Sequence, residues 1–378
     1  MNEPILIERV GDIRDGVRVD RVRLEHFRNY GHLELELGPG FNVIAGRNGQ
    51  GKTNFLESLY LIATTRLMRG QRDAEAIEDG HETALVTVQL APLGSEAGMR
   101  LDRGTRKRAS LNGMSLPRAS DLMGRMPCVC VSAEDMEIVR GDPAQRRLFL
   151  DLELSSRSPA YLRHLSVYKR ALEQRNAVIR ESKEWFQPEA VWEPWEVQLA
   201  EHGTEIRNAR REFVERLRTP LSLYQGRIGD GEPVGASYVA RDAADSAEGM
   251  IGLLASSRQV DVHRGSTGTG PHRDELAFEV AGRDARLFGS QGQQRTTVIA
   301  LKLACLEAAT ELEGVPPLLL LDDIFSDLDQ NRRASLVAAV LELAGQAVLT
   351  CTEPSAAGPA ILEQAAIFNV NAGTVTAA

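Results

Sequence analysis

The feature that most constrains this chain is a glycine-rich octapeptide, GRNGQGKT, at residues 46–53. It follows the short apolar run Phe41–Ala45, which is typical of a buried strand, and Lys52–Thr65 then carries apolar residues at helical spacing. A strand, a glycine loop and a helix in this order form a phosphate-binding loop, because glycines allow successive backbone N–H groups to point at an anion. The sequence therefore predicts an α/β sheet that binds a nucleoside triphosphate.

The pattern of this loop predicts roles for its polar residues. Lys52 is expected to reach the β and γ phosphates, and the Thr53 hydroxyl is expected to ligate Mg²⁺. The predicted cofactors are therefore ATP and Mg²⁺. The residues that we expect to contact the nucleotide are Gly46, Arg47, Asn48, Gly49, Gln50, Gly51, Lys52, Thr53 and Asn54.

The acidic partner of this loop lies far along the chain. The apolar run Leu318–Leu321 predicts a strand buried on both faces, and it is followed by Asp322 and Asp323. Asp322 is suited to hold Mg²⁺, and Asp323 is suited to polarise the attacking water. Asp322 follows Lys52 by 270 residues, whereas compact P-loop kinases and GTPases have these two motifs much closer together. The spacing favours an ABC-type ATPase head interrupted by an insertion.

Two further patterns describe the rest of the chain. Alternating apolar and polar residues predict an antiparallel β layer beside the phosphate-binding sheet, in the runs 19–27, 32–37, 84–90 and 106–116. From about residue 144 the apolar period becomes helical, which predicts two antiparallel helices. The stripe of the first helix is interrupted near Arg175, and the segment Glu184–Trp195, which holds all three tryptophans, is expected to connect the pair.

Together these patterns predict an α/β fold in two parts. The first part is an ABC-type ATP-binding head, in which the phosphate-binding sheet lies beside the β layer, and it is expected to comprise residues 19–153 and 262–378. The second part is an inserted, mainly helical arm of residues 154–261.

Two short motifs near Asp322 indicate a second half of the nucleotide site. Ser290-Gln291-Gly292-Gln293, at the start of a predicted long helix, resembles the ABC signature SGGQ with Gln291 in place of a glycine. Such a helix start presents a hydroxyl and bare N–H groups to an anion. In ABC-type heads that anion is the γ-phosphate held by the other subunit. A second segment, Ser326-Asp327-Leu328-Asp329, resembles the D-loop of ABC-type heads. The D-loop crosses the same dimer interface.

These motifs and several shorter ones, in this order, resemble the RecF family of bacterial DNA repair proteins. The likeness extends from about Val19 to Val370, which is nearly the whole chain. The motifs that carry it are LEHFRNY at 24–30, GRNGQGKTN at 46–54, Glu134-Asp135, Gly141-Asp142-Pro143 with Arg146-Arg147, GPHRDE at 270–275, GSQGQQRT at 289–296 and LLLLDDIFSDLD at 318–329.

The resemblance implies a cytoplasmic ABC-type ATPase whose heads form a homodimer on ATP and bind DNA. It also implies that the protein acts at gaps or junctions without sequence specificity, and that it helps to load a recombinase together with RecO and RecR. ATP hydrolysis would be weak and stimulated by DNA. The implied catalytic residues are Asp323, Lys52 and Glu134, the last at the position of the ABC Q-loop glutamine. Thr352 replaces a histidine found in many ABC-type heads, which fits slow hydrolysis.

Charge and composition limit the other classes of function. The net charge of −9 argues against a broadly basic nucleic-acid binder, so any DNA contact must use local basic patches. Arg28 is expected either to face nucleotide or DNA, or to form an exposed ion pair. A solvated charged surface explains the candidate DNA-binding residues equally well, and these are Arg66, Arg69, Arg72, Arg106, Lys107 and Arg108.

Neither a structural metal nor a membrane is expected. Cys128 and Cys130 share one face of a strand-like run, but no second Cys or His pair at ligand spacing accompanies them, so we interpret the four cysteines as reduced thiols. No run reaches the ~18 apolar residues of a membrane span, and the start of the sequence lacks the apolar segment of a signal peptide.

Three alternatives remain open from the residues alone. One is the ATPase subunit of a membrane transporter, which predicts a shorter spacing between the motifs and an intact SGGQ. Another is a small-molecule P-loop kinase, which needs a compact fold with an acceptor site. The third is a DNA-binding protein that keeps ATP as a structural ligand without hydrolysing it.

Overall fold

The computed structural model describes residues 16–70, 72–229 and 231–378 and divides the chain into two compact units. Unit 1 contains the described residues up to Val129 together with Ala309–Leu321 and Leu341–Ala378. Unit 2 contains Cys130–Ala308 and Asp322–Val340. The predicted division into a head and an inserted arm uses different boundaries, and it stays a prediction.

Unit 1 contains the predicted antiparallel β layer, whose strand order is β2-β1-β4-β5-β6-β7. Its inner face is built by alternation: in β1, Val22 and Leu24 are fully buried while Arg21 and Arg23 are exposed. The strand bounds are β1 Arg18–Phe27, β2 Tyr30–Glu36, β4 Thr83–Ala91, β5 Ser95–Asp102, β6 Arg108–Leu111 and β7 Met114–Ser115. The four predicted runs are therefore confirmed as strands, and β5 is an additional one.

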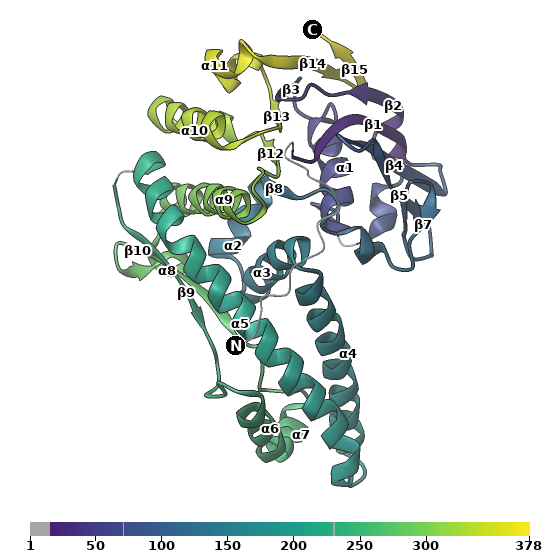
Figure 1. The fold of residues 1–378 in the computed structure, drawn as a ribbon, viewed down its shortest axis with the longest axis vertical. Helices are drawn as coiled ribbons and strands as arrows, with labels where there is room; N and C mark the ends of the chain where they lie inside the picture. The colour runs from purple at the N-terminus through teal and green to yellow at the C-terminus, as the bar shows by residue number, and fades with distance from the viewer. Residues whose placement is uncertain (1–15, 71, 230) are drawn as a thin grey trace. The chain divides into compact units, whose positions relative to one another are not determined.

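The phosphate-binding sheet has the order β15-β14-β3-β13-β12-β8 (Figure 1). Strand β3 pairs in parallel with both β13 and β14, and every residue of β3 and β13 is buried, which explains why their sequences are mostly apolar. The strand bounds are β3 Phe41–Ala45, β8 Cys128–Val131, β12 Leu318–Asp322, β13 Ala347–Cys351, β14 Ala365–Asn371 and β15 Thr374–Ala377.

The helix after the glycine loop is α1, Lys52–Thr64, as predicted. Short helical turns complete unit 1, and they are η1 Asp73–Ala76, η2 Ala119–Leu122, η5 Pro354–Ala357 and α11 Pro359–Leu362.

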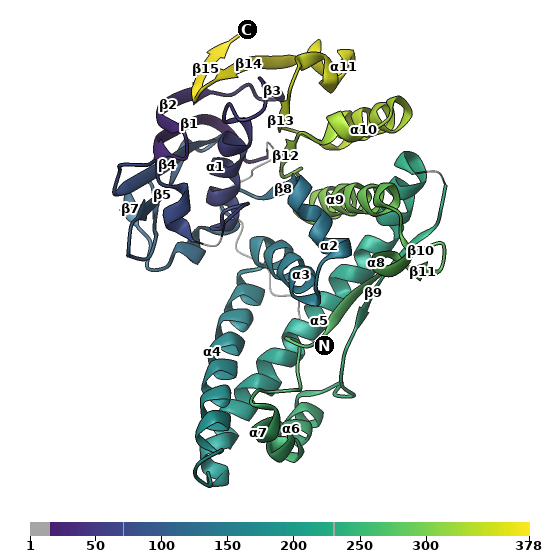
Figure 2. The ribbon, with the colours of Figure 1, turned by 180° about the vertical axis from the view of Figure 1, so that it is seen from behind.

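The long helices of unit 2 are α4, Pro159–Glu181, and α5, Glu189–Ile228, which lie side by side as the predicted antiparallel pair (Figures 1 and 2). Helices α6, Ala247–Ser256, and α7, Arg258–Arg264, pack near the end at which α4 and α5 are joined. The core between these helices includes Tyr161, Leu165, Tyr168, Leu199 and Ile206.

The remaining elements of unit 2 are a small sheet and several further helices and turns. A three-stranded sheet has the order β11-β10-β9. Helix α9, Gln291–Glu313, begins in unit 2 and continues into unit 1. The other bounds are η3 Ala133–Met136, α2 Glu137–Arg140, α3 Pro143–Arg157, β9 Val234–Val239, β10 Glu275–Val280, β11 Arg283–Asp284, α8 Ala285–Phe288, η4 Ile324–Asp327 and α10 Gln330–Leu343.

The tryptophan-rich connection is shorter than predicted. Pro188 caps the start of α5, so Trp192 and Trp195 belong to the helix rather than to the loop. The Trp192 ring is buried beneath the Arg175 guanidinium, whose centre lies 5.4 Å from the ring centroid. Only Trp185 lies in the connection, where 73% of its surface is exposed.

The interrupted stripe of α4 has a structural cause. Arg175 is fully buried, and its guanidinium pairs with Glu196 and, over 2.7 Å, with Asp261. It also donates to the Thr267 hydroxyl and to a backbone carbonyl. A buried charge of this kind is tolerated only when its donors are satisfied, so the polar residue interrupts the pattern but not the core.

In the described part of the chain, no helix combines the length and apolarity that a membrane span requires.

Candidate nucleotide-binding site

The phosphate-binding loop is held in an open turn by its glycines. Gly51 has φ 121° and Gly49 has φ 80°, a region that side chains with a Cβ avoid. At Gly46 the limit is space, because an added Cβ would lie 2.4 Å from the Val370 carbonyl oxygen. The Gly46 N–H donates to the Cys351 carbonyl over 3.2 Å, which ties the loop to the end of β13.

The lysine of the loop, Lys52, lies over the backbone of the same loop. Lys52 is buried, and its Nζ donates to the carbonyls of Gly46, over 2.6 Å, and Arg47, over 3.1 Å. Helix α1 begins here with Gly51 at the N-cap, so no side chain caps the first turn. A positive charge beside the N–H groups of a helix start is an arrangement that binds phosphate.

The β1–β2 hairpin supports this loop from one side. The Asn29 amide donates to the Gln50 carbonyl over 2.9 Å, and the Tyr30 hydroxyl donates to the Gly51 carbonyl over 3.0 Å. Asn54, predicted to contact nucleotide, donates instead to the Asn29 side chain over 2.8 Å. The motif LEHFRNY therefore includes residues that position the phosphate-binding loop.

The turn between β14 and β15 supports the loop from another side. The Gly373 N–H donates to the Gln50 carbonyl over 3.1 Å, and the Ala372 N–H donates to Gln50 Oε1 over 2.8 Å. An added Cβ at Gly373 would lie 2.2 Å from the Asn29 carbonyl oxygen, so both supports meet here. Sequence reasoning missed this contact, because the turn lies some 320 residues after the loop it holds.

Arg28 forms an ion pair, one of the two predicted possibilities, but its partner is buried. Arg28 Nε and Nη2 donate to the two carboxylate oxygens of Glu57 over 2.8 and 3.1 Å. The Glu57 side chain is fully buried in α1 and also accepts from the Arg69 N–H over 3.0 Å. The pair therefore joins the hairpin to the helix of the phosphate-binding loop.

A cavity of about 790 Å³ opens beside the loop. Its size is within the range of small-ligand sites, and its walls come from the loop and from β14. The lining residues are Gly46, Arg47, Asn48, Gln50, Asn369, Val370 and Asn371.

The predicted Mg²⁺ aspartate ends strand β12. Asp322 is its last residue, and the sheet order places one strand, β13, between β12 and the strand that enters the glycine loop. Asp323 follows with φ 50°, and its carboxylate accepts a hydrogen bond from the Ser326 hydroxyl. Thr53, the second residue of α1, supplies a half-buried hydroxyl. Carboxylate and hydroxyl oxygens are the donors that Mg²⁺ prefers, so each of these side chains offers a suitable type of ligand atom.

The signature segment starts α9 through a reciprocal capping box. The Gln293 N–H donates to Ser290 Oγ over 3.2 Å, while the Ser290 N–H donates to Gln293 Oε1 over 2.7 Å. Gln293 Nε2 also contacts both carboxylate oxygens of Glu232, at 2.9 and 2.7 Å. Ser290 and Gln291 are exposed, whereas Gly292 is half-buried. The box fixes the helix start and leaves the serine accessible.

The D-loop leads into the next helix in the same unit. Asp329 caps α10, because its carboxylate accepts from the Arg332 N–H over 3.0 Å, and this bond lowers the pKa of Asp329. An added Cβ at Gly292 would lie 3.4 Å from Arg332 Nη1, so the starts of α9 and α10 are neighbours. Ser326 is exposed, and the side chain of Asp327 lies outside the described part of the structure.

Glu134 and Thr352, which the resemblance places at the Q-loop and histidine positions of ABC-type heads, are both at the surface. Glu134 is exposed in the first turn of η3, beside Asp135, which is engaged by Ser132 and by Lys302 Nζ over 2.8 Å. Thr352 is exposed directly after β13.

The candidate DNA-binding residues divide into two groups. Lys107 pairs with Asp73 over 2.9 Å, and Arg108 pairs with Asp102 over 2.8 Å. Arg69 donates to a side chain of α1 over 2.7 Å. Three others are exposed, and their side chains form no ion pair with a described carboxylate; these are Arg66, Arg72 and Arg106.

The motif GPHRDE organises the interior of unit 2. Asp274 is fully buried and accepts two hydrogen bonds from Arg207, over 2.7 and 2.9 Å, and one from the Tyr238 hydroxyl over 2.6 Å. His272 Nδ1 lies 2.6 Å from the Tyr168 hydroxyl, and desolvation lowers the pKa of His272 to about 4. These contacts join α4, α5 and the sheet, so this motif has a packing role.

Comparisons with known proteins agree with this geometry. Residues 18–373 match the family described as "RecF/RecN/SMC N terminal domain". The DNA replication and repair protein RecF of Symbiobacterium thermophilum is 39% identical over 346 residues, which cover 88% of this chain and 90% of that protein. A solved structure of the recombination mediator protein RecF with ATP, in the RecFOR pathway, has a TM-score of 0.87 at 29% identity and covers 96% and 98% of the two chains.

A more distant structure supports the fold alone. The Smc head domain of Pyrococcus furiosus has a TM-score of 0.56 at 16% identity, over 96% of each chain. The predicted ABC-type ATPase head is thereby confirmed as the fold class.

Proposed function

The chain belongs to the RecF family of DNA replication and repair proteins, and from this premise we propose that it is an ATP-operated DNA clamp of recombinational repair. Two copies would sandwich two ATP molecules and close on DNA, and weak, DNA-stimulated hydrolysis would reset the clamp. The observation that carries the proposal is the accessible start of α9, where a capping box presents Ser290 to solvent. A helix start that exposes a serine hydroxyl can supply one side of a phosphate site, because the N-terminal end of a helix favours an anion.

The surface beside Ser290 supports pairing through this face. Leu287 and Phe288, three and two residues before it, expose 72% and 58% of their surface. Neighbouring apolar side chains at this level of exposure are typical of protein contact sites. A second copy of the chain would cover them while bringing its own nucleotide to the signature segment.

The proposed roles follow the chemistry of each group. Lys52 and the loop N–H groups would bind the phosphates, and Thr53 and Asp322 would hold Mg²⁺, which neutralises phosphate charge when bound. Asp323 would polarise water, and Glu134 would assist. Across the dimer, the γ-phosphate would be contacted by Ser290, Gln291, Gly292 and Gln293, with Ser326, Asp327 and Asp329 of the D-loop beside them.

The biological setting is also a proposal. The related structure belongs to the RecFOR pathway, which supports action with RecO and RecR at gaps or single-strand/double-strand junctions to load a recombinase. We place the protein in the cytoplasm without a membrane partner. We also retain the head of residues 19–153 and 262–378 and the arm of residues 154–261 as its functional parts. The transporter-subunit and kinase alternatives do not account for membership of the RecF family.

The decisive test is Ser290→Arg, measured by light scattering with and without ATP and repeated with a gapped duplex. We expect the wild type to dimerise on ATP, and the variant to bind ATP but remain a monomer, because a bulky side chain occupies the shared site. Ser246→Arg is the matched control, since Ser246 also caps a helix, α6, through its Oγ over 3.1 Å. Normal ATP-dependent dimerisation of Ser290→Arg would contradict the proposal.

Hydrolysis separates this proposal from a protein that keeps ATP without cleaving it. We expect Asp323→Asn to dimerise on ATP but to lose at least ~100-fold in turnover, the usual contribution of a general base. The control is Asp79→Asn, which changes an exposed carboxylate of unit 1, whereas Asp323 belongs to unit 2. Equal turnover in Asp323→Asn and wild type would remove Asp323 from catalysis. A wild type that shows no turnover would favour the non-hydrolysing alternative.

A further inference from the structure

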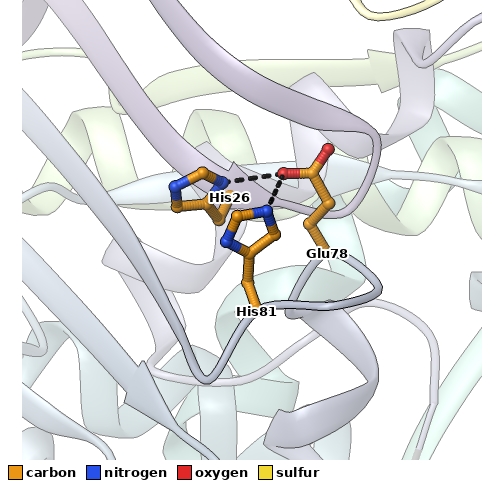
Figure 3. A group of neighbouring side chains, drawn as sticks. All are labelled: His26, Glu78 and His81. Atoms are coloured by element: carbon orange, nitrogen blue, oxygen red, sulfur yellow. Dashed lines mark hydrogen bonds and ion pairs between the residues drawn. The ribbon is translucent and has the colours of Figure 1, made fainter.

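A compact group of side chains that can ligate a metal ion lies near the turn end of the β1–β2 hairpin. Among the described residues, His26, Glu78 and His81 form the group of three in which all candidate ligand atoms lie within 4.8 Å of one another (Figure 3). His26 Nδ1 is 2.8 Å and His81 Nε2 is 3.6 Å from the same oxygen, Glu78 Oε2. We propose that these residues bind a divalent transition-metal ion, with Zn²⁺ as the best fit.

The donor set selects the class of ion. Two imidazole nitrogens and one carboxylate oxygen are the ligands of open zinc sites, which keep a fourth position for water or another ligand. Imidazole suits Zn²⁺, Cu²⁺ and Ni²⁺ rather than Mg²⁺ or Ca²⁺. The ligands are also different from Thr53 and Asp322, so the proposal goes beyond the nucleotide-linked Mg²⁺ and is independent of it.

The spacing suits a tetrahedral ion. Ligand bonds of about 2.0–2.1 Å at tetrahedral angles place ligand atoms ~3.3 Å apart. The separations of 2.8 and 3.6 Å from Glu78 Oε2 lie on either side of that value. Small side-chain movements are therefore enough to equalise them around a central ion.

The backbone already holds the three residues together. His26 has φ 50°, an uncommon conformation for a residue with a side chain, and its carbonyl accepts from the Glu78 N–H over 2.8 Å. The His81 N–H donates to the Glu78 carbonyl over 3.2 Å, closing a tight turn. A bridge between Phe27 and Ile77 fixes the same two segments. Such preorganisation lowers the entropy that binding an ion would cost.

One rearrangement is required. The two imidazole rings are stacked, with centroids 3.6 Å apart and planes 14° apart. A bound ion lies close to the plane of each ring that ligates it, so the rings must rotate out of the stack. His26 and His81 expose 39% and 43% of their side chains, which leaves room for that rotation.

The site would reinforce the support of the phosphate-binding loop. Two residues after His26, Arg28 pairs with Glu57 of α1, and the next residue, Asn29, holds the Gln50 carbonyl. An ion that joins His26 to the turn at 78–81 would therefore restrict the motion of this hairpin near its own turn, where Arg28 and Asn29 lie.

The test uses the reduced, full-length protein without nucleotide. We expect calorimetric titration with Zn²⁺ to give a site of one ion per chain, and Co²⁺ to give the visible absorption of a four-coordinate ion. His81→Ala and Glu78→Gln should each weaken binding at least ~10-fold, because loss of an outer-shell partner alone costs 10–100-fold. Thermal melts without metal check that the variants are folded.

Two control variants make the result specific. His32→Ala removes an exposed histidine of the same hairpin and should leave affinity unchanged. His202→Ala should also leave it unchanged, although His164 and His202 of unit 2 have their Nδ1 atoms 2.9 Å apart. The proposal is overturned if the wild type binds no Zn²⁺, if folded His81→Ala binds as tightly as the wild type, or if His202→Ala removes the binding.

Discussion

At the residue scale, the contact with the largest expected energetic effect in unit 1 joins Arg28 to Glu57. Glu57 is fully buried, and Arg28 satisfies both of its oxygens. We expect Arg28→Met to lower the free energy of unfolding by ~3 kcal/mol, because removing one partner leaves an uncompensated buried charge. Urea unfolding measures this change. Nucleotide affinity should fall as well, since Glu57 lies in the helix that begins with Lys52.

A matched control lies in β1, the strand that ends just before Arg28. Arg21 pairs with Glu34 and Glu36 at the surface, where its side chain is 45% exposed. Because exposed ion pairs contribute little, Arg21→Met should leave the unfolding midpoint unchanged. Adding Glu57→Gln to Arg28→Met should restore part of the lost stability, since the buried charge is then gone. A double variant less stable than Arg28→Met would contradict the assignment.

The residue scale also separates what the sequence could predict from what it could not. The phosphate-binding roles of the glycines, Lys52 and Thr53 can be predicted from the sequence, because the motif that defines them is eight residues long. The partner of Arg28 lies 29 residues away, on a helix whose pattern does not distinguish a buried glutamate from a solvated one. His26, Glu78 and His81 are likewise joined only by the fold, so a search for cysteine and histidine spacing did not find them.

At the element scale, the β14–β15 turn is expected to control nucleotide binding although it lies outside the glycine motif. Gly373 has φ 77°, and an added Cβ would meet the Asn29 carbonyl oxygen, which belongs to the other support of the loop. We expect Gly373→Ala to displace the phosphate-binding loop and to weaken ATP binding about tenfold. This corresponds to a loss of ~1.4 kcal/mol in the free energy of ATP binding. Equilibrium titration with a fluorescent ATP analogue measures it.

The control for this variant is another left-handed glycine in the same unit. Gly94 has φ 64°, but nothing lies within 4 Å of an added Cβ. Gly94→Ala therefore carries the same backbone strain without the close contact, and it should bind ATP as the wild type does. If both variants weaken binding equally, strain rather than the support of the loop is responsible.

Elements were predicted well where one residue pattern dominates them. Strands β3 and β13 have mostly apolar sequences, and helix α1 has a regular buried face, so their bounds are close to those expected. The sequence pattern places Trp192 in the connection between the two helical stripes, yet α5 includes this residue and continues through Pro194. Tertiary packing beneath Arg175 overrides the local signal there.

At the scale of the whole molecule, a net charge of −9 must be reconciled with DNA binding. The sequence could predict that any DNA surface is local, but not which basic residues are already paired. The structure separates them: Lys107 and Arg108 have carboxylate partners, while Arg66, Arg72 and Arg106 are exposed without one among the described residues. Cations without an acidic neighbour can exchange counterions for DNA phosphates at the lowest cost.

This distinction predicts how DNA affinity depends on salt. Replacing Arg66, Arg72 and Arg106 with serine should weaken ATP-dependent binding to a gapped duplex and reduce the slope of log affinity against log salt by about 3, one for each lost phosphate contact. Fluorescence anisotropy at several salt concentrations measures the slope. The control is Arg216→Ser with Arg218→Ser, at exposed residues of α5 that pair with glutamates on their own helix. A slope that changes only in the control would place the DNA surface on α5 instead.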